Sequence, residues 1–468
     1  MSDPTLPALS RQVAHQCRQL QQAQGLPFAE HLPARTIHNT LRQVGGFFRH
    51  RLYTPAVTLW TFLSQLLDPD PSCRQAVARF LAWRVAQGLP CCSPENSAYC
   101  KARSRLPEEL LARLTRNTGQ QVLDDADGAW LWQGRPVKVV DGTGLSMPDT
   151  PANQKEYPQP NSQKPGVGFP LLRLVVIFSL AVGTVLEAAF APYRGKGTGE
   201  LSLFRTLSQQ LQPGDVLLGD RIFCTYWEVT ATVARGADAV LRLHGGRRPI
   251  NFRLGQRLGP GDRLVWWKRP ARPEWMSRQE YDKVPKELRL RGVQVRLQQR
   301  GFRVKKIVVV TTLLEPALAP REELADLYRA RWQAELDLRA LKQTLQMDVL
   351  RGQSPEMVRK ELWGHLLVYN LVRGLMAQAA RAWGLKPRQV SFKGALQTIN
   401  AFWPLLKVAR SEVEALRLWL GMIWAMGQHE VGDRPDRYEP RKVKRRPKNY
   451  DRLNEPRAKA KKRLATMT

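Results

Sequence analysis

The chain has 468 residues, a hydrophobic content of 43% and 14 tryptophans, which is enough apolar material for two or three globular domains. Its formal net charge of +32 and isoelectric point near 10.5 exclude an acidic surface and predict a polyanionic partner, with nucleic acid favoured over an anionic membrane. The longest apolar run, residues 170–191, contains Arg173 and Glu187 and is a poor membrane span, and MSDPTLPALSRQ has no apolar signal core.

Residues 1–130 are predicted to form a helical domain. Apolar residues recur at helical spacing in TLWTFLSQLL and CRQAVARFLAWRVAQGL, and Ser72 is placed to cap the second of these helices. A short basic helix with Lys101, Arg103 and Arg105 precedes the next helix. Two short helices joined by a tight turn fit a DNA-reading helix-turn-helix, and they fit a plain helical bundle with a basic surface equally well.

Strand periodicity begins after residue 130. The β-branched segment PVKVVD is expected to end at Asp141, and two strands around Gly183-Thr184 form a predicted hairpin after a polar loop at residues 153–168. A helix, a strand that ends at Asp220, another helix and the strand ADAVLRL come next. Three antiparallel strands followed by alternating helices and strands are the order of an RNase H-like core, in which helices cover a mixed sheet.

A basic segment at residues 244–306 interrupts this core. It is rich in Gly, Pro and Arg, it is expected to form short strands and turns, and it contains 18 Lys and Arg against 5 Asp and Glu. The C-terminal tail, residues 431–468, has 14 against 5 and too little apolar content to fold alone. The rest of the chain is only mildly basic.

The strand IVVVTTLL leads into an amphipathic helix that is expected to run unbroken over residues 320–346. Tyr328, Arg331, Glu335 and Lys342 fall within about 60° of one another on its helical wheel and form one polar stripe. Taken alone, the stripe favours a solvated face with an ion pair between Arg331 and Glu335. It also fits a carboxylate that holds a metal while its neighbours bind phosphate oxygens.

Three acids occupy comparable places in this predicted core. Asp141 and Asp220 follow strands, and Glu335 lies on a helix beside the sheet. Each is weak evidence alone, because Asp-Gly after a strand is most often a turn and Gly-Asp is often a helix cap. Together, in a basic protein, they indicate oxygen ligation of Mg²⁺ or Mn²⁺. Two such ions, about 3.5–4 Å apart, can activate a hydroxyl and stabilise a leaving oxygen.

The chain resembles the cut-and-paste DDE transposases of the insertion-sequence-four family. The resemblance is carried by strand-DGT with Asp141, by LLGDRIF with Asp220 and by the YREK signature that ends at Lys342. The loop NQKEYPQPNSQKPGVGFP and the KRRPKNY tail are also similar. The resemblance implies that Asp141, Asp220 and Glu335 form a metal-binding catalytic triad.

The resemblance also implies an activity and its partners. Members of this family hydrolyse one strand, use the freed 3′-hydroxyl to form a hairpin on the transposon end, reopen it and join the end to target DNA. Tyr328, Arg331 and Lys342 would contact DNA phosphates beside the scissile bond. The implied cofactor is a pair of Mg²⁺ or Mn²⁺ ions. The implied assembly is a homodimer in a synaptic complex on double-stranded terminal repeats and target DNA, in the prokaryotic cytoplasm, associated with the nucleoid and away from membranes.

Hairpin formation requires a base removed from the stack, and aromatic side chains can hold such a base. Trp266 and Trp267 lie side by side in a predicted strand of the basic segment. Neighbours in a strand point to opposite faces, so at most one of them is expected in the core. Either tryptophan is a candidate platform for the flipped base, and packing alone is the alternative.

The predicted fold is an α/β RNase H-like core with a mainly β insertion, an all-α N-terminal domain and a helical C-terminal region. The expected segments are the DNA-end-binding helical domain (1–130), the catalytic core (131–243 and 307–350), the insertion (244–306), the C-terminal helices (351–430) and the basic tail (431–468). A nuclease or Holliday-junction resolvase, and a non-catalytic DNA-binding protein, are the alternatives. A nuclease would not need the insertion or the helical flanks. A non-catalytic DNA-binding protein that is a decayed transposase need not keep all three acids.

Overall fold

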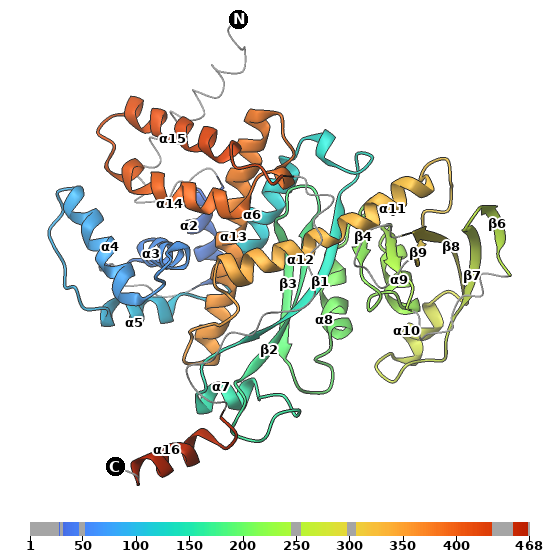
Figure 1. Ribbon diagram of the computed structural model, residues 1–468, viewed down its shortest axis with the longest axis horizontal. Coiled ribbons are helices and arrows are strands. Elements are labelled where there is room, and N and C mark those ends of the chain that lie inside the picture. Colours follow the sequence, from blue (N-terminus) through green and yellow to red (C-terminus); the bar gives the residue numbers. More distant parts are fainter. Residues whose placement is uncertain are drawn as a thin grey trace, which may run out of the picture. The chain divides into compact units, whose positions relative to one another are not determined.

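A computed structural model describes residues 28, 31–45, 52–244, 254–296, 306–432 and 453–466 of the chain (Figure 1). The chain divides into two compact units. The helical unit comprises residues 1–130, 181–186 and 337–432, and the sheet unit comprises residues 131–180, 187–336 and 433–468. No helix in the described ranges is both long enough and apolar enough to cross a bilayer.

The helical unit confirms the predicted helical N-terminal and C-terminal regions. Its α-helices are α2 (Ala34–Val44), α3 (Pro55–Leu67), α4 (Cys73–Ala86), α5 (Ser97–Arg105), α6 (Glu108–Asp124), α13 (Pro355–Trp383), α14 (Phe392–Val408) and α15 (Glu412–Gly427). Ser72 caps α4 as predicted, because its hydroxyl accepts a hydrogen bond from the Gln75 backbone N–H at 3.2 Å. Short 3₁₀ turns lie at Gly128–Trp130 and Pro387–Gln389.

Helix α13 is the centre of the helical unit. It is 29 residues long and is buried along most of its length, and it packs on α6, α3, α14 and α15. Its apolar residues surround the whole helix, which is the pattern of a helix enclosed by others. Ser354 caps its start, and Gly384 ends it in the left-handed conformation (φ 65°) that favours glycine.

The sheet unit is organised around a nine-stranded sheet in the order β3-β2-β1-β4-β5-β9-β8-β7-β6. The strands are β1 (Val137–Ser146), β2 (Leu171–Ser179), β3 (Val185–Pro192), β4 (Val216–Gly219), β5 (Asp238–Arg242), β6 (Gln256–Gly259), β7 (Asp262–Lys268), β8 (Glu287–Arg296) and β9 (Lys306–Thr311). The helices of this unit are α7 (Pro151–Glu156), α8 (Glu200–Leu207), α9 (Tyr226–Val233), α10 (Arg278–Lys283), α11 (Arg321–Ala330) and α16 (Arg457–Ala465), with a 3₁₀ turn at Ser208–Gln210.

The first five strands have the pairing of an RNase H-like core. Strand β1 pairs antiparallel with β2 and parallel with β4, and β4 pairs parallel with β5. Helix α8 lies between β3 and β4 in the chain, and α9 lies between β4 and β5. The predicted fold class is therefore confirmed.

Strand β1 does not end at Asp141, contrary to the prediction. It continues to Ser146, because its antiparallel pairing with β2 extends as far as Ser146 opposite Leu171. Its parallel pairing with β4 stops earlier, at Val139 opposite Leu218. Asp141 therefore lies in a part of β1 that is paired with β2 but no longer with β4. The polar loop that follows also contains a short helix, α7.

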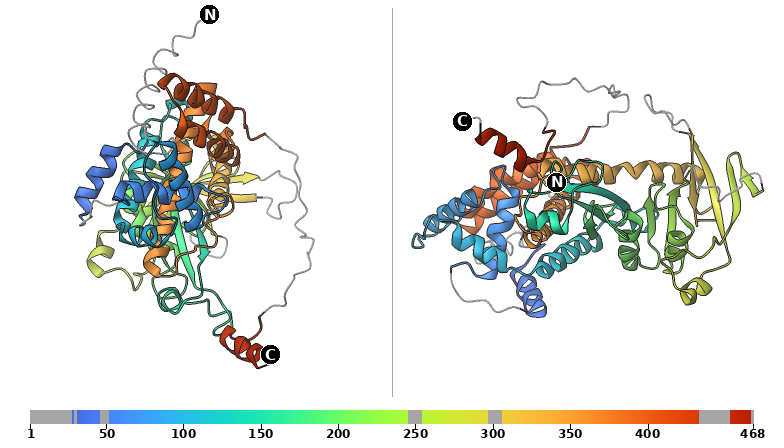
Figure 2. Two further views of the ribbon diagram at one scale, coloured as in Figure 1. Left: turned by 90° about the vertical axis from the view of Figure 1, so that its left-hand side faces the viewer. Right: turned by 90° about the horizontal axis from the view of Figure 1, so that it is seen from below.

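The basic insertion continues the central sheet. Strands β6, β7 and β8 pair successively antiparallel, and β8 pairs with β9, the strand that returns to the core. Figure 2 shows these yellow-green strands beside the green strands of the core. The predicted short strands are thus present, while residues 245–253 and 297–305 lie outside the described residues.

The helix that was predicted to run unbroken over residues 320–346 is divided into three segments. Helix α11 ends at Ala330, α12 spans Trp332–Arg339, and a π-helix spans Ala340–Thr344. The Leu345 N–H donates to the Ala340 carbonyl at 3.0 Å, a hydrogen bond across five residues that is typical of a π-turn. The regular α-helical spacing is lost there, so the single straight stripe predicted to reach Lys342 is wrong.

Candidate active site

Asp141 and Asp220 lie at the same edge of the sheet. In the parallel pairing, Val139 is opposite Leu218, and two further residues along each strand lead to Asp141 and Asp220. Carboxyl ends of parallel strands meet at one edge, where ligands of open α/β sheets are usually bound. Asp220 directly follows β4, as predicted, and its Oδ1 accepts a hydrogen bond from the Ile222 N–H at 2.7 Å. The strand register therefore brings the two aspartates together.

Glu335 on α12 belongs to the same electrostatic group. Its Oε1 lies 2.7 Å from Nη2 of Arg331, in the ion pair that the helical spacing predicted. The charges of Glu335 and Asp220 both act on Asp141, so Asp141 lies within electrostatic reach of the other two predicted acids. Each of the three acids is part of the sheet unit.

The carboxyl group of Asp141 has a raised pKa. Burial, together with the negative charges of Glu335 and Asp220, raises its pKa to about 6. The Gly142 N–H, which donates to Asp141 Oδ1 at 2.8 Å, and the Arg331 guanidinium oppose this rise. A cation between the acids would offset the same burial and repulsion.

A fourth acid, Glu200, lies beside this group and was not predicted. A Cβ placed on Gly142 would lie 2.9 Å from the Glu200 carboxyl carbon, so any larger residue at position 142 would displace Glu200. Burial raises the pKa of Glu200, the Arg173 guanidinium lowers it, and the Asp220 charge raises it. The sequence contains no signal for Glu200, because an acid in the first turn of a helix is favoured by the helix dipole whether or not it has a function.

Arg242 is a cation at this edge that the sequence analysis also missed. In the pairing of β4 with β5, Gly219 is opposite Leu241, so the next residues are Asp220 and Arg242. Asp141, Asp220 and Arg242 thus occupy successive places in one row across three parallel strands. The position of Arg242 at the end of a predicted strand could have been recognised in the sequence. The sequence analysis considered that position only for acidic residues.

The residues of this edge have suitable chemistry for a hard divalent cation. They offer carboxylate oxygens from Asp141, Asp220 and Glu335, the type of ligand that Mg²⁺ and Mn²⁺ prefer. In the part of the chain that the structure describes, no three Asp, Glu, His or Cys side chains form a closed ligand group. Glu335 is paired with Arg331 and Asp141 accepts from Gly142, so the acids are near one another without converging on one point.

The YREK residues are divided between the two units. Tyr328 is 7% exposed, and burial raises its pKa to about 12, while the Arg331 and Arg242 charges oppose the rise. Tyr328 and Arg331 therefore belong to the electrostatic environment of the acids. Lys342 lies in the π-helix, which is part of the helical unit.

The two tryptophans of the insertion lie on β7 and face opposite sides, as predicted. Trp267 is 4% exposed and packs edge-on against Tyr226, with ring centroids 5.6 Å apart. Trp266 is 46% exposed. Its neighbour opposite on β8 is Arg289. Trp266 is therefore the accessible one of the pair.

The three basic residues of α5 differ in their surroundings. Arg103 donates to Gln65 Oε1 at 3.0 Å and lies over the rings of Phe62 and Tyr99, with its guanidinium carbon 5.3 and 5.6 Å from the two centroids. Its position is explained by packing within the helical unit. Lys101 and Arg105 are exposed and remain available for a partner.

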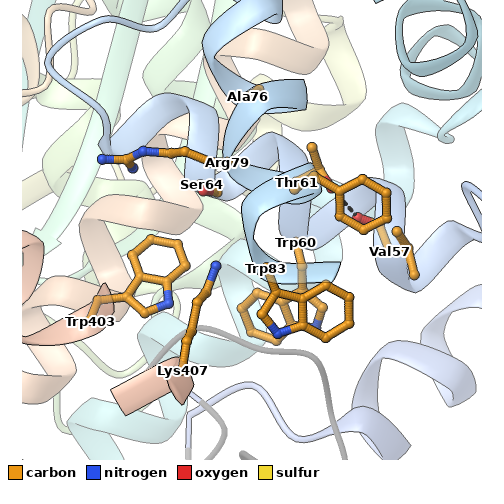
Figure 3. A pocket seen from close by; sticks show the side chains of 10 residues that line it. Val57, Trp60, Thr61, Ser64, Ala76, Arg79, Trp83, Trp403 and Lys407 are labelled. Atoms are coloured by element: carbon orange, nitrogen blue, oxygen red, sulfur yellow. Dashed lines mark hydrogen bonds between the residues drawn. The ribbon is translucent and has the colours of Figure 1, made fainter. Parts of the chain in front are cut away.

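A pocket in the helical unit is lined by α3, α4 and α14 (Figure 3). Trp60, Trp83 and Trp403 form aromatic parts of its wall, and Lys407 and Arg79 supply two cations. The Lys407 ammonium lies 4.2 Å from the centroid of the Trp403 ring. Burial, together with the charge of Arg79, lowers the pKa of Lys407 to about 8. None of the predicted site residues lines this pocket.

We expect Lys407→Met to stabilise the protein at pH 7. The pKa of Lys407 is about 8 in the folded protein and lies near 10.4 when the chain is unfolded, so the buried charge destabilises the fold below pH 8. The gain on substitution is about 1–3 kcal/mol at pH 7 and disappears as the pH rises from 8 through 10.4. Thermal unfolding of both proteins at pH 7 and at pH 10.5 measures it, and an equal difference at both values would contradict it.

Known proteins similar to this chain include transposases along most of its length. The family model described as "Transposase DDE domain" matches residues 132–371, just over half of the chain. The chain is 28% identical to the transposase InsG for insertion sequence element IS4 of Escherichia coli (strain K12), over 86% of this chain and 88% of that protein. It is 26% identical to the putative transposase InsZ of the same strain, over 42% of this chain and 63% of that protein.

A solved structure, the cryo-EM structure of the piggyBac transposase synaptic complex with hairpin DNA, aligns with 88% of this chain and 85% of that chain. The two are 12% identical with a TM-score of 0.42, which is too distant to support a conclusion. The family model, by contrast, spans the strand that contains Asp141, Asp220 directly after β4, and the helix that contains Glu335. The chain therefore belongs to the family of transposases with a DDE domain, and its likeness to InsG agrees with the insertion-sequence-four group.

Proposed function

We propose that this protein is a cut-and-paste transposase that cleaves DNA at the ends of an insertion sequence and joins them to target DNA. One observation carries the proposal. The register of β1 with β4 places Asp141 beside Asp220, and Asp141 is within electrostatic reach of Glu335. Acids gathered in a protein with a formal net charge of +32 fit a substrate that is itself highly anionic.

In this proposal the three acids hold the same metal ions, and different donors orient their carboxylates. Asp141, Asp220 and Glu335 would hold one or two Mg²⁺ or Mn²⁺ ions, which supply Lewis acidity toward the attacking hydroxyl and the leaving oxygen. Asp141 and Asp220 are fixed by backbone N–H donors, so their carboxylates are oriented before the substrate binds. Glu335 is oriented by Arg331.

Cations near the acids would position the scissile phosphate. Arg331 bonds Glu335 through Nη2 and also hydrogen-bonds the Tyr328 hydroxyl, and its remaining guanidinium N–H groups would bind phosphate oxygens. Arg242 ends the row of Asp141 and Asp220 and would bind the same strand of DNA. Tyr328 would donate its phenolic O–H, since its raised pKa keeps it protonated. Lys342 is proposed as a further phosphate contact.

We expect Arg331→Ala and Lys342→Ala each to weaken DNA binding and to reduce its salt dependence. Each phosphate contact that is lost lowers the slope of log K against log[salt] by about 0.9. Titration of a labelled terminal-repeat duplex at several salt concentrations measures the slope. An unchanged slope in both variants would mean that the two side chains serve only the helix.

In the proposed reaction the first cut frees a 3′-hydroxyl, which attacks the opposite strand and closes a hairpin. That geometry needs a base outside the stack, and an exposed indole can hold it by stacking. Trp266 is proposed for this role rather than Trp267, because Trp267 is in the core. The basic residues around it, such as Arg289 opposite on β8, would hold the backbone of the distorted strand.

We expect Trp266→Ala to reduce hairpin formation by about fivefold to a hundredfold while nicking is retained, because stacking is worth about 1–3 kcal/mol per base. The matched variant Trp267→Ala should instead lower the melting temperature, since truncating a buried tryptophan costs about 3–5 kcal/mol. Denaturing gels on a terminal-repeat substrate separate nicked from hairpin products. Loss of nicking and hairpinning in equal measure would remove the platform role from Trp266.

Cutting both ends of an element requires that they be held together, so the proposed active form is a homodimer on paired double-stranded terminal repeats. The N-terminal helices are proposed to bind the repeat. In α5, Lys101 and Arg105 are the exposed candidates, and Arg103 would act through the packing of the helix. The proposed place of action is the prokaryotic nucleoid.

The function is tested by incubating the protein with Mg²⁺ and a supercoiled plasmid that carries candidate terminal inverted repeats. Excised and rejoined products are the expected result. Cleavage without joining would assign the protein to the nucleases or resolvases. Binding without cleavage would identify a non-catalytic DNA-binding protein and overturn the proposal.

A further inference from the structure

The C-terminal helix α16 has an unusual composition. It spans Arg457–Ala465 with the sequence RAKAKKRLA, which contains five cations and no acid. Like charges four residues apart, such as Arg457 with Lys461, destabilise an isolated helix, and nine residues are too few for a stable helix in water. Something outside the helix must therefore hold this segment in helical form.

One end of α16 is anchored on the loop between β1 and β2 in the sheet unit, beside α7 (Figure 1). Arg457 Nη1 lies 3.2 Å from Asp149 Oδ2, and its guanidinium carbon lies 5.0 Å from the centroid of the Phe169 ring. The backbone N–H of Arg457 donates to the Gly166 carbonyl at 3.5 Å. Gly166 has a φ of +76°, and a Cβ there would lie 3.0 Å from Pro456. The positive φ favours glycine at this position, and a larger residue would crowd Pro456.

The loop that receives α16 is itself held by internal hydrogen bonds. The side-chain oxygen of Gln159 accepts from the Gly166 N–H at 3.0 Å and from the Gly168 N–H at 3.1 Å. Its amide nitrogen donates to the carbonyls of Gln163 and Lys164 at 3.2 and 2.9 Å. The loop begins directly after β1, the strand that contains Asp141, so the anchor of α16 is built on a catalytic strand.

Three of the five cations of α16 lie on one side of the helix, while Lys461, at about 40°, lies on the side of Arg457. With Arg457 at 0° on the helical wheel, Lys462, Lys459 and Arg463 fall at about 140°, 200° and 240°. They form one face on the side opposite the anchored residue. All three are exposed, and Arg463 is paired with Glu455 at 2.8 Å. Lys459 and Lys462 have no carboxylate partner among the described residues.

We propose that the face formed by Lys459, Lys462 and Arg463 binds the phosphate backbone of duplex DNA, with the β1–β2 loop as its rigid base. The ligand class follows from the charges, because a polyanion relieves the repulsion between neighbouring cations and stabilises the helix. No base-reading side chain accompanies them, so binding is independent of sequence. The inference rests on the proposed function only in taking DNA as the partner, and it assigns a second contact with DNA on the sheet unit.

The test is DNA binding by the full chain, with a labelled random-sequence duplex, without divalent ions and at several salt concentrations. In the variant K459Q/K462Q/R463Q, we expect the salt slope to fall by about 2–3, because three contacts contribute about 0.9 each. We expect affinity at low salt to fall at least tenfold. The control K393Q/R410Q/R417Q removes the same charge from exposed positions of the helical unit and should change the slope by less than one. Equal slopes in the two triple variants would overturn the proposal.

A second variant separates anchoring from charge. D149N/F169A keeps every cation and makes the protein one charge more positive, so bulk electrostatics alone predicts tighter binding. Release of α16 from the loop predicts weaker binding, by about threefold or more. Binding equal to or tighter than wild type would overturn the anchored arrangement. Binding without plasmid cleavage by the wild type would count against the proposed function and leave this inference intact, whereas normal cleavage with an unchanged slope would count against this inference alone.

Discussion

Replacing Asp141, Asp220 or Glu335 by alanine is expected to abolish strand cleavage, by on the order of 10⁴-fold, which is the scale observed when one member of a catalytic group is lost. The physical reason is that each substitution removes carboxylate oxygens that would hold the metal ions in the proposed mechanism. Binding to the terminal repeat should be retained, because the acids repel the DNA backbone and their loss removes that repulsion. Cleavage is measured on a labelled repeat in Mg²⁺, and binding is measured in its absence.

A matched control for these variants lies on α11. Asp326→Ala removes an exposed acid that pairs with Arg329, and it should leave both cleavage and binding within about twofold of wild type. Asp141→Asn keeps the size of the side chain and still removes the charge, so its loss of cleavage cannot be attributed to a cavity. Retained Mg²⁺-dependent cleavage in any one of the three alanine variants would remove that residue from the proposed triad.

Asp337→Ala is expected to have a large effect on stability. Asp337 is fully buried in the helical unit and accepts hydrogen bonds from Arg388 Nη1 at 2.6 and 2.7 Å and from Arg373. Its loss leaves two guanidinium groups without their common partner in the interior. An uncompensated buried charge costs about 3–5 kcal/mol. We expect the melting temperature of the protein to fall on the order of 10 °C.

Asp326→Ala is the matched control here as well, because it breaks an exposed ion pair close to Asp337 in sequence. Exposed pairs contribute about 0–1 kcal/mol, so its melting temperature should change by only a few degrees. Differential scanning calorimetry on both variants provides the measurement. A small shift for Asp337→Ala would mean that Arg373 and Arg388 find other partners, and the triple variant with both arginines replaced by methionine would then be no more stable than the single one.

Local pattern was enough to predict much of this molecule. Alternating and β-branched runs identified the core strands, and the Gly-Asp at the end of β4 placed Asp220 directly after a strand. The hydroxyl of Ser72 and the spacing of Arg331 with Glu335 gave a cap and an ion pair that the structure contains. These features depend on residues within four positions of one another, so the sequence contains all the information that they require.

Other features depended on contacts between distant segments. Strand β1 passes beyond Asp141 because β2 pairs with it there, which no property of the DGT segment indicates. Glu200 lies beside Gly142, and Arg242 aligns with Asp220, only once strands and helices are assembled. A helical wheel assumes regular α-helical spacing, so it could not predict that the helix over residues 320–346 is divided at Arg331 and at the π-helix.

The sequence by itself determined the charge of the protein, its fold class, the identity of the three predicted acids and the separation of Trp266 from Trp267. Tertiary structure alone decided which strand ends are neighbours, which acid is buried enough for its pKa to reach about 6, and where the helix α16 is anchored. The physical reason is the distance along the chain over which each effect acts. Propensity, capping and periodicity act over a few residues, whereas burial and charge interactions depend on segments that meet only after the chain has folded.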